Sequence, residues 1–217
     1  MKEIILVCSD LFGLEVYSIL SDINRRHKED NSLQPYHVLG YICDNDCPFG
    51  DCYDGLERLG SIMGWKRSGN ERYVLGIKEP DKKKMATDCL LSNGCVFESV
   101  CSPWTLGNSF PIGEGSVIDA YSMKQGIQIG RFVTAIHCML PSITIGDYST
   151  IMRFANVTGE VGCFSYIGNH AYTHLGKKVG DHCYVADGSV VVKDVKSGTV
   201  VSGVPARRIK QGEELAK

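Results

Sequence analysis

From Ile112 onward the sequence repeats in steps of about six residues. A helix would need apolar residues about every 3.6 positions, and a half-buried strand every 2. A period of six instead predicts a parallel β-helix, in which three short strands make one coil and neighbouring coils bury each other's apolar side chains. Aliphatic-Gly pairs recur at spacings of 17, 16, 16 and 18 residues, at Ile112-Gly113, Ile129-Gly130, Ile145-Gly146, Val161-Gly162 and Val179-Gly180. A strict spacing of six separates Val161, Ile167, Thr173, Val179, Val185 and Val191.

The first hundred residues carry a different pattern, in which short apolar runs alternate with helical stretches. The runs 3–7, 38–42, 73–77 and 96–100 predict strands, and 14–26 and 80–91 predict helices. The polar segment 25–34 is expected to be a surface loop. Strands that alternate with helices indicate a parallel sheet. We therefore expect an α/β domain over 1–102, a β-helix over 103–205 and a tail over 206–217.

Composition and charge narrow the classes of partner. The chain is 43% hydrophobic and 22% charged, with a formal net charge of −2, which is typical of a soluble globular protein and disfavours nucleic-acid binding. The longest basic run, 82–84, is interpreted as a solvated first helical turn, with a phosphate contact as the alternative. The apolar stretch 4–7 is too short for a signal peptide or a membrane span, so a cytoplasmic protein is expected.

The ten cysteines are then expected to be reduced thiols. Cys43, Cys47 and Cys52 lie close together in an acidic segment, which raises the question of a soft metal ion. The group lacks a paired C-x₂-C spacing, so we interpret it as an acidic, Cys-containing loop and expect no metal.

Particular repeats carry a resemblance to a known family. Ile145-Gly-Asp-Tyr-Ser-Thr, Val179-Gly-Asp-His-Cys-Tyr and the ending Ser202-Gly-Val-Pro-Ala-Arg-Arg-Ile resemble the coils and tail of hexapeptide acyltransferases. With an α/β half in front, the chain is similar to the sialic acid O-acetyltransferase and UDP-amino-sugar N-acetyltransferase family. The resemblance implies a Rossmann-like α/β domain followed by a left-handed parallel β-helix of hexapeptide repeats. It also implies a homotrimer, with acetyl-CoA between subunits and a nucleotide-sugar on the N-terminal half.

The turn after the first strand departs from the family pattern. The family has a glycine-rich turn that lets the backbone approach a pyrophosphate at a helix N-terminus. Here only the last glycine of that turn is present, and Asp10 brings a negative charge near the phosphate position. The resemblance assigns substrate binding to Ser9, Asp10, Phe12, Gly13 and Asp44. The alternative is an ordinary turn in which Ser9 or Asp10 caps the helix.

The general base of the family is a histidine four positions ahead of an aliphatic-Gly pair. Those positions here hold Gln125, Pro141, Val157 and Leu175. A neutral imidazole elsewhere in the coils would still accept a proton near neutral pH. The candidates, in order, are His170, His174 and His137, with the Glu160 carboxylate as an outside candidate. A structural or surface role is the alternative for each of these residues.

Acetyl-CoA is expected along the later coils. Small residues at Ala186, Gly188 and Ser189 leave room for a pantetheine arm, and Arg207 and Arg208 suit phosphate groups. The alternative is ordinary coil packing and a basic C-terminal segment.

The resulting hypothesis is transfer of an acetyl or related acyl group from acyl-CoA to an amino or hydroxyl group of a sugar or nucleotide-sugar, for surface glycans. A non-catalytic trimeric scaffold is one alternative, because several motif residues are changed together. An acyltransferase whose acceptor carries no nucleotide is another. A fold by itself does not decide among these.

Overall fold

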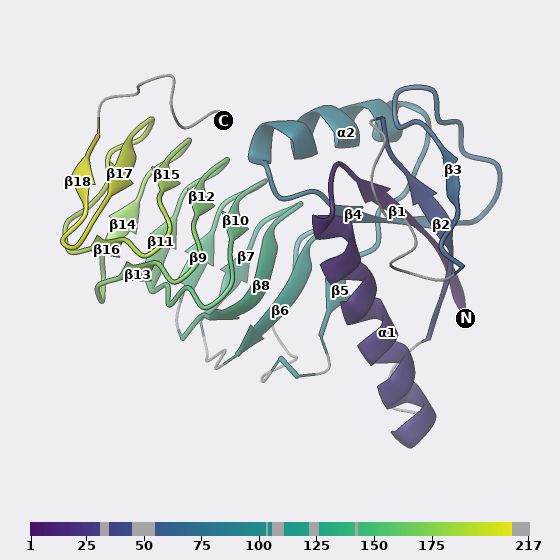
Figure 1. Cartoon of the computed structure of the whole chain (residues 1–217), viewed down its shortest axis with the longest axis horizontal. Helices are drawn as coiled ribbons and strands as arrows, with labels where there is room; N and C mark the ends of the chain where they lie inside the picture. Colours follow the sequence, from purple (N-terminus) through teal and green to yellow (C-terminus); the bar gives the residue numbers. More distant parts are fainter. Residues whose placement is uncertain are drawn as a thin grey trace.

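The computed structural model of the chain describes residues 1–30, 35–44, 55–102, 104–105, 111–121, 126–141 and 143–209. It consists of an α/β unit and a parallel β-helix, and the two helices lie over one end of the coils (Figure 1). This arrangement confirms the fold class expected from the repeats and from the alternating N-terminal pattern. Neither described helix is long and apolar enough to cross a membrane.

The α/β unit is built on a four-stranded parallel sheet of order β3-β2-β1-β4. The strands are β1 (Lys2–Cys8), β2 (Tyr36–Ile42), β3 (Arg58–Gly60) and β4 (Arg72–Gly76). The helices are α1 (Phe12–Asp30) and α2 (Pro80–Ser92). Because α1 continues to Asp30, the expectation of a loop from residue 25 is wrong up to that point, and 31–34 lie outside the described residues.

The expected strand 96–100 is not a strand of this sheet. Phe97 makes a single bridge to Tyr73, and β5 (Val100–Cys101) pairs with the first long strand of the β-helix, β6 (Val117–Tyr121). The fourth strand is instead β3, whose three residues follow a segment rich in turn formers. The domain division at 102/103 stays a prediction.

Short strands on successive coils form the β-helix. They stack as sheets of order β18-β17-β15-β12-β10-β8-β6-β5, β14-β11-β9-β7 and β13-β16, and every pair is parallel except β17–β18. The further strands are β7 (Gln128–Ile129), β8 (Thr134–Met139), β9 (Ile143–Ile145), β10 (Thr150–Ile151), β11 (Gly159–Val161), β12 (Tyr166–Ile167), β13 (Tyr172–Thr173), β14 (Lys178–Val179), β15 (Tyr184–Val185), β16 (Val190–Val191), β17 (Val200–Ser202) and β18 (Arg207–Arg208).

The residues of the six-residue period form the inside of the coils. All six from Val161 to Val191 are at most 2% exposed. The five aliphatic ones belong to one apolar cluster, and the sixth, Thr173, is a buried polar residue. Register confirms the stacking, since Val161 aligns with Ile145 on one side and with Val179 on the other. The period of six therefore marks the residues that point into the coil.

A mixed core joins the two units. Val16 and Leu20 of α1 share an apolar cluster with Ile136 and Met152, which lie on the outer face of the coils. Lys83 of α2 is fully buried at the same junction, so its expected place in a solvated turn is wrong. Its Nζ donates to the Phe132 and Ser149 carbonyl oxygens at 3.3 and 3.1 Å and to Thr150 Oγ1 at 2.6 Å.

Candidate functional site

The turn after β1 uses Asp10 to begin α1. Asp10 Oδ1 accepts a hydrogen bond of 2.8 Å from the Phe12 backbone N–H, which is the geometry of an N-cap. Asp10 Oδ2 lies 3.3 Å from Lys78 Nζ. Gly13 lies against the end of β4, where a Cβ on Gly76 would be 2.9 Å from the Gly13 Cα. The turn is therefore closed by a carboxylate where the family has glycines.

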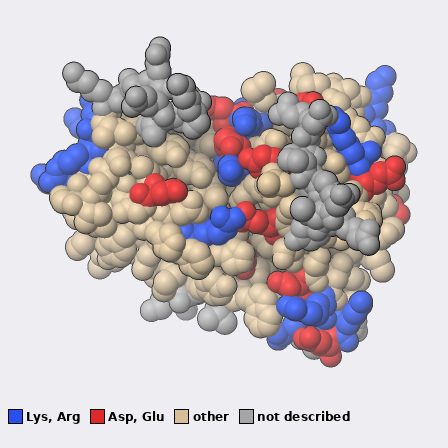
Figure 2. All heavy atoms as spheres, viewed as in Figure 1, with Lys and Arg blue, Asp and Glu red and all other residues tan. Residues whose placement is uncertain are grey.

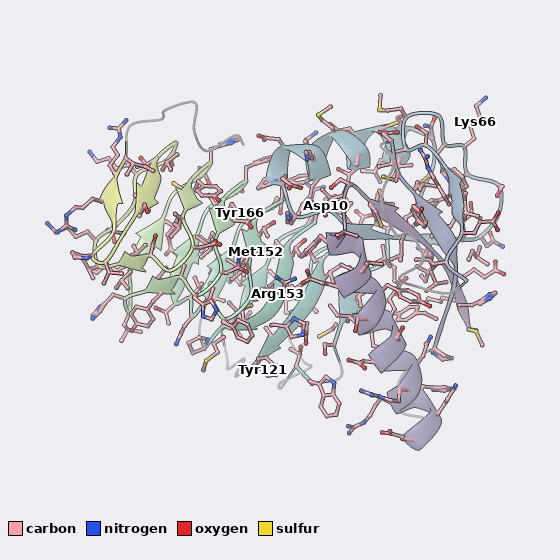
Figure 3. The ribbon with its side chains drawn as sticks, viewed as in Figure 1. Asp10, Lys66, Tyr121, Met152, Arg153 and Tyr166 are labelled. Carbon is pink, nitrogen blue, oxygen red and sulfur yellow. The ribbon has the colours of Figure 1, made fainter. Side chains whose placement is uncertain are left out.

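A cavity of about 480 Å³ lies beside this turn, between the start of α1 and the outer face of the coils, and we call it the seam pocket. In Figure 2 acidic and basic side chains gather along this boundary, and in Figure 3 Asp10, Met152, Arg153 and Tyr166 lie along it. Arg153 forms an ion pair with Glu15 of α1 across the boundary. The lining residues are Asp10, Leu11, Phe12, Glu15, Lys78, Met152, Arg153, Tyr166 and Asn169.

Ser9 and Asp44 line a separate, more apolar cavity of about 200 Å³ with residues such as Ile62 and Met85. Asp44 Oδ1 accepts hydrogen bonds from the Ser61 hydroxyl and, at 3.0 Å, from the Met63 backbone N–H. Its carboxylate thus caps the turn that follows β3. The structure divides the five expected substrate residues. Asp10 and Phe12 line the seam pocket, Ser9 and Asp44 line the smaller cavity, and Gly13 lines neither of these two cavities.

Among the four base candidates, His137 is the one whose side chain has a carboxylate partner in the described part of the chain. The pairing of β6 with β8 shifts register after Asp119, which leaves His137 as an extra residue with φ of 49°. Such bulges redirect a side chain. His137 Nε2 lies 3.1 Å from Asp119 Oδ2, and Asp119 is only 4% exposed. His137 Nδ1 is buried and has no hydrogen-bond partner among the described residues.

The other candidate bases are placed differently. The exposed His170 stacks on Phe154, with ring centroids 4.9 Å apart. It shares one corner of the coils with His137, because the Phe154 N–H donates to the His137 carbonyl and the His170 N–H to the Arg153 carbonyl. His174 follows β13 on another face and is exposed. The carboxylate of Glu160, also exposed, lies 2.8 Å from Lys178 Nζ.

Asp119 was not among the sequence candidates, although it is an acidic residue within an apolar, buried strand. Its charge acts on the groups around it. Burial raises the pKa of the Cys138 thiol, and the Asp119 charge raises it further. Burial raises the pKa of the Tyr121 phenol as well, and the Asp119 charge raises it further. The Cys138 thiol and the Tyr121 phenol therefore stay protonated near neutral pH.

The residues expected to hold acetyl-CoA fall at two places. Ala186 and Gly188 lie in the turn after β15, and the buried Ser189 accepts a hydrogen bond of 3.3 Å at Oγ from the Gly203 N–H. The exposed Arg207 and Arg208 form β18 and line a basic cavity of about 360 Å³ that also includes Lys193 and Lys196. Four strands, β17, β15, β12 and β10, lie between β18 and the β8 strand of His137.

Within the described residues no group of three or more His, Cys, Asp or Glu side chains is arranged to hold a metal ion. Of the segment examined for a metal site, Cys47 and Cys52 lie outside the described residues.

Three solved structures share this architecture over nearly the whole chain. WeeI from Acinetobacter baumannii AYE has a TM-score of 0.72 at 22% identity, over 96% of this chain and 100% of its own. The acetyltransferase domain of PglB from Neisseria gonorrhoeae FA1090, in complex with acetyl coenzyme A, has a TM-score of 0.65 at 16% identity, over 96% and 99%. PerB from Caulobacter crescentus, in complex with CoA and GDP-perosamine, has a TM-score of 0.62 at 16% identity, over 97% and 98%.

The chain has the fold of the PglB acetyltransferase domain, WeeI and PerB. The resemblance drawn from the repeats is thereby confirmed for the fold, including the left-handed β-helix.

Curated relatives match shorter parts of the chain. The bifunctional protein GlmU of Aquifex aeolicus is 31% identical over 120 residues, which is 51% of this chain and 26% of that protein. A 2,3,4,5-tetrahydropyridine-2,6-dicarboxylate N-acetyltransferase of Clostridium perfringens is 49% identical over 51 residues, or 24% and 22%. The chain thus aligns with about a quarter of the length of these relatives. No known family model matches it.

Proposed function

We propose that this protein transfers an acetyl or related acyl group from acetyl-CoA to an amino or hydroxyl group of a sugar, in the cytoplasm and for surface glycans. The fold supports acetyl transfer, because the PglB domain and PerB, which share it, hold acetyl coenzyme A or CoA. The observation that carries the proposal is the His137–Asp119 pair, an imidazole oriented by a buried carboxylate at a corner of the coils.

The reaction needs one base and one stabilised oxyanion. The sugar nucleophile attacks the thioester carbonyl, the base takes its proton, and backbone N–H groups stabilise the developing oxyanion. With Nε2 donating to Asp119, Nδ1 of His137 is the proton acceptor. This atom is buried although the side chain is 40% exposed, so the reaction requires a small rotation that exposes Nδ1 while Nε2 stays in contact with Asp119. Catalytic hydrogen bonds often align only once substrate is bound.

His137→Asn tests the assignment of the base. Asparagine tolerates the positive φ of this position, so the backbone is retained. We expect kcat in a CoA thiol-release assay, over a panel of amino sugars and UDP-sugars, to fall by about 10² to 10⁴, because a positioned base contributes that much. Affinity for acetyl-CoA, measured by calorimetry, should stay within about twofold because the variant removes no contact proposed for the cofactor.

Two matched variants complete this experiment. His174→Asn removes an exposed histidine on another face and should keep nearly wild-type kcat. His170→Asn separates the two histidines that share a corner. Loss of turnover in His170→Asn with normal turnover in His137→Asn would reassign the base. Absence of acetyl-CoA binding at millimolar concentration would instead favour a non-catalytic scaffold.

We also propose that the protein assembles as a homotrimer through its coils. Three large apolar side chains, Tyr121, Met139 and Tyr172, are 44%, 43% and 39% exposed. Met139 pairs with Tyr121 on one side and with Asn156 on the other, and Asn156 pairs with Tyr172 on the next coil. We call this set the apolar row. An apolar row of this kind is poorly buried in a single chain, and cyclic symmetry closes such a contact without leaving a free surface.

A further inference from the structure

We infer that the seam pocket binds an amino sugar that carries no nucleotide diphosphate, and that Asp10 excludes the diphosphate; the inference rests on the acetyl transfer proposed above. The pocket lies where the family-like turn meets the coils, and three observations support this choice of acceptor. They concern the start of α1, the charges of the pocket and its unpartnered acceptor atoms.

The start of α1 is already occupied by the protein itself. A helix N-terminus attracts phosphate through its free N–H groups and its dipole. Here the N–H of Phe12 donates to Asp10 Oδ1 at 2.8 Å. The next two, of Gly13 and Leu14, donate to the carbonyl oxygens of Asp10 and Leu11 at 3.2 and 3.0 Å. A diphosphate would therefore have to displace a carboxylate and two backbone contacts to reach these groups.

The cations of the seam pocket are neutralised in place. Lys78 pairs with Asp10 at 3.3 Å, and Arg153 pairs with Glu15. Among the described lining residues the charges thus balance, with two acids against two bases. A like charge about 4 Å away weakens binding roughly fivefold in a fully wet site and more in a drier one. A diphosphate would meet this repulsion from Asp10 without gaining a free cation.

The pocket instead offers acceptor atoms that await donors. Glu15 Oε2 and Asn169 Oδ1 are both buried, and neither has a hydrogen-bond partner in the part of the chain that the structure describes. Buried acceptors left without donors are costly and rare. Burial also raises the pKa of the Tyr166 phenol, which keeps its proton and can donate. Sugar hydroxyls and an amino group supply donors for these two acceptor atoms, whereas a diphosphate supplies further acceptors.

Binding of UDP and GDP to the full chain, measured by calorimetry, tests the exclusion. Asp10→Asn keeps an N-cap acceptor for the Phe12 N–H but removes the charge and releases Lys78. We expect no diphosphate binding to the wild type at 1 mM and a gain of roughly tenfold or more in affinity for Asp10→Asn. Asp22→Asn is the matched control, because Asp22 pairs with Arg25 on the exposed side of the same helix and should change nothing.

The outcomes are distinct. Wild-type binding of UDP or GDP with a dissociation constant below about 1 mM overturns the inference, and so does an Asp10→Asn protein that folds normally and gains no affinity. A second arm compares kcat/KM for methyl glycosides of amino sugars with that for UDP-linked amino sugars. Preference for the glycosides supports the inference, and preference for the UDP-sugars overturns it. Thiol release and acetyl-CoA binding are measured in the same samples, so failure of acetyl transfer itself is recognised separately.

Discussion

A buried lysine links the two units of the molecule in addition to the mixed apolar core. Lys83 is fully buried, and its Nζ contacts three oxygen atoms of the coils. Burial holds the pKa of Lys83 well below its ordinary value. The folded state therefore binds fewer protons than the unfolded state between the lowered pKa and the ordinary one. Stability is then greatest above the ordinary pKa and is lost as the pH falls toward the lowered pKa.

This linkage predicts a pH dependence that belongs to one residue. As the pH rises toward the ordinary lysine pKa of about 10.4, the free energy of unfolding of the wild type should increase, by up to about 1.4 kcal/mol per pH unit. Lys83→Met should remove that part of the slope, because methionine fills the site without a titrating group. Urea unfolding at several pH values measures the difference. Lys84→Met, on the exposed side of the same helix, should keep the wild-type slope.

The sequence placed Lys83 with its neighbours in a basic run, and such runs are usually solvated. Lys83 is buried because of tertiary contacts, since the oxygen atoms that accept its hydrogen bonds belong to residues 49 to 67 positions away in the sequence. The His137–Asp119 pair is of the same kind. It depends on a register shift between two strands, which a repeat period cannot reveal. The histidine was therefore a candidate from sequence, while its partner was not.

At the scale of elements, the glycines of the aliphatic-Gly pairs set how closely the coils approach. A Cβ on Gly146 would be 2.5 Å from the Cys163 backbone nitrogen and 2.7 Å from the Gly162 carbonyl carbon. Real contacts are never so short, so any larger residue would have to push two coils apart. At Gly146 the close approach of the coils therefore requires glycine.

Gly146→Ala should accordingly destabilise the protein by about 2 kcal/mol or more, as over-packed sites do. Gly64→Ala is the control, because a Cβ at Gly64 would meet no atom within 4 Å. That change should stay within about 0.5 kcal/mol. Equal stability of the two variants in urea unfolding would contradict the close approach of the coils.

Elements in which a regular pattern repeats over many residues were predicted well, and short elements without a pattern were not. The six-residue period identified the inward positions of the coils. An apolar helical stripe identified α1, and Pro80 at the start with Asn93-Gly94 at the end identified α2. β3 was not predicted, because a strand of three residues is too short to show a periodic pattern. The run 96–100 was apolar, but its last residue pairs with β6, and only the path of the chain decides which sheet an apolar run joins.

At the scale of the whole molecule, the apolar row predicts the assembly. The wild type should have three times the mass of one chain in light scattering at micromolar concentration. Met139→Glu places a charge in the middle of the row and should yield monomers, because an unpaired buried charge is strongly unfavourable. Lys66→Glu changes a residue that lies on the α/β unit, away from the coils, and should remain trimeric (Figure 3). A wild-type monomer would contradict the proposal.

The two ends of the β-helix are covered unequally. At one end β5 and β6 contribute Val100 and Val117 to the mixed core with α1. At the other end, among the described residues, β17 pairs with β18, whose two arginines are exposed. In a stack where each coil contacts only its neighbours, fraying starts at the less protected end. Amide hydrogen exchange should therefore be fastest in β16–β18 and slow stepwise toward β8. If acetyl-CoA binds Arg207 and Arg208, its binding should stabilise the end of the β-helix that opens first and slow amide exchange there.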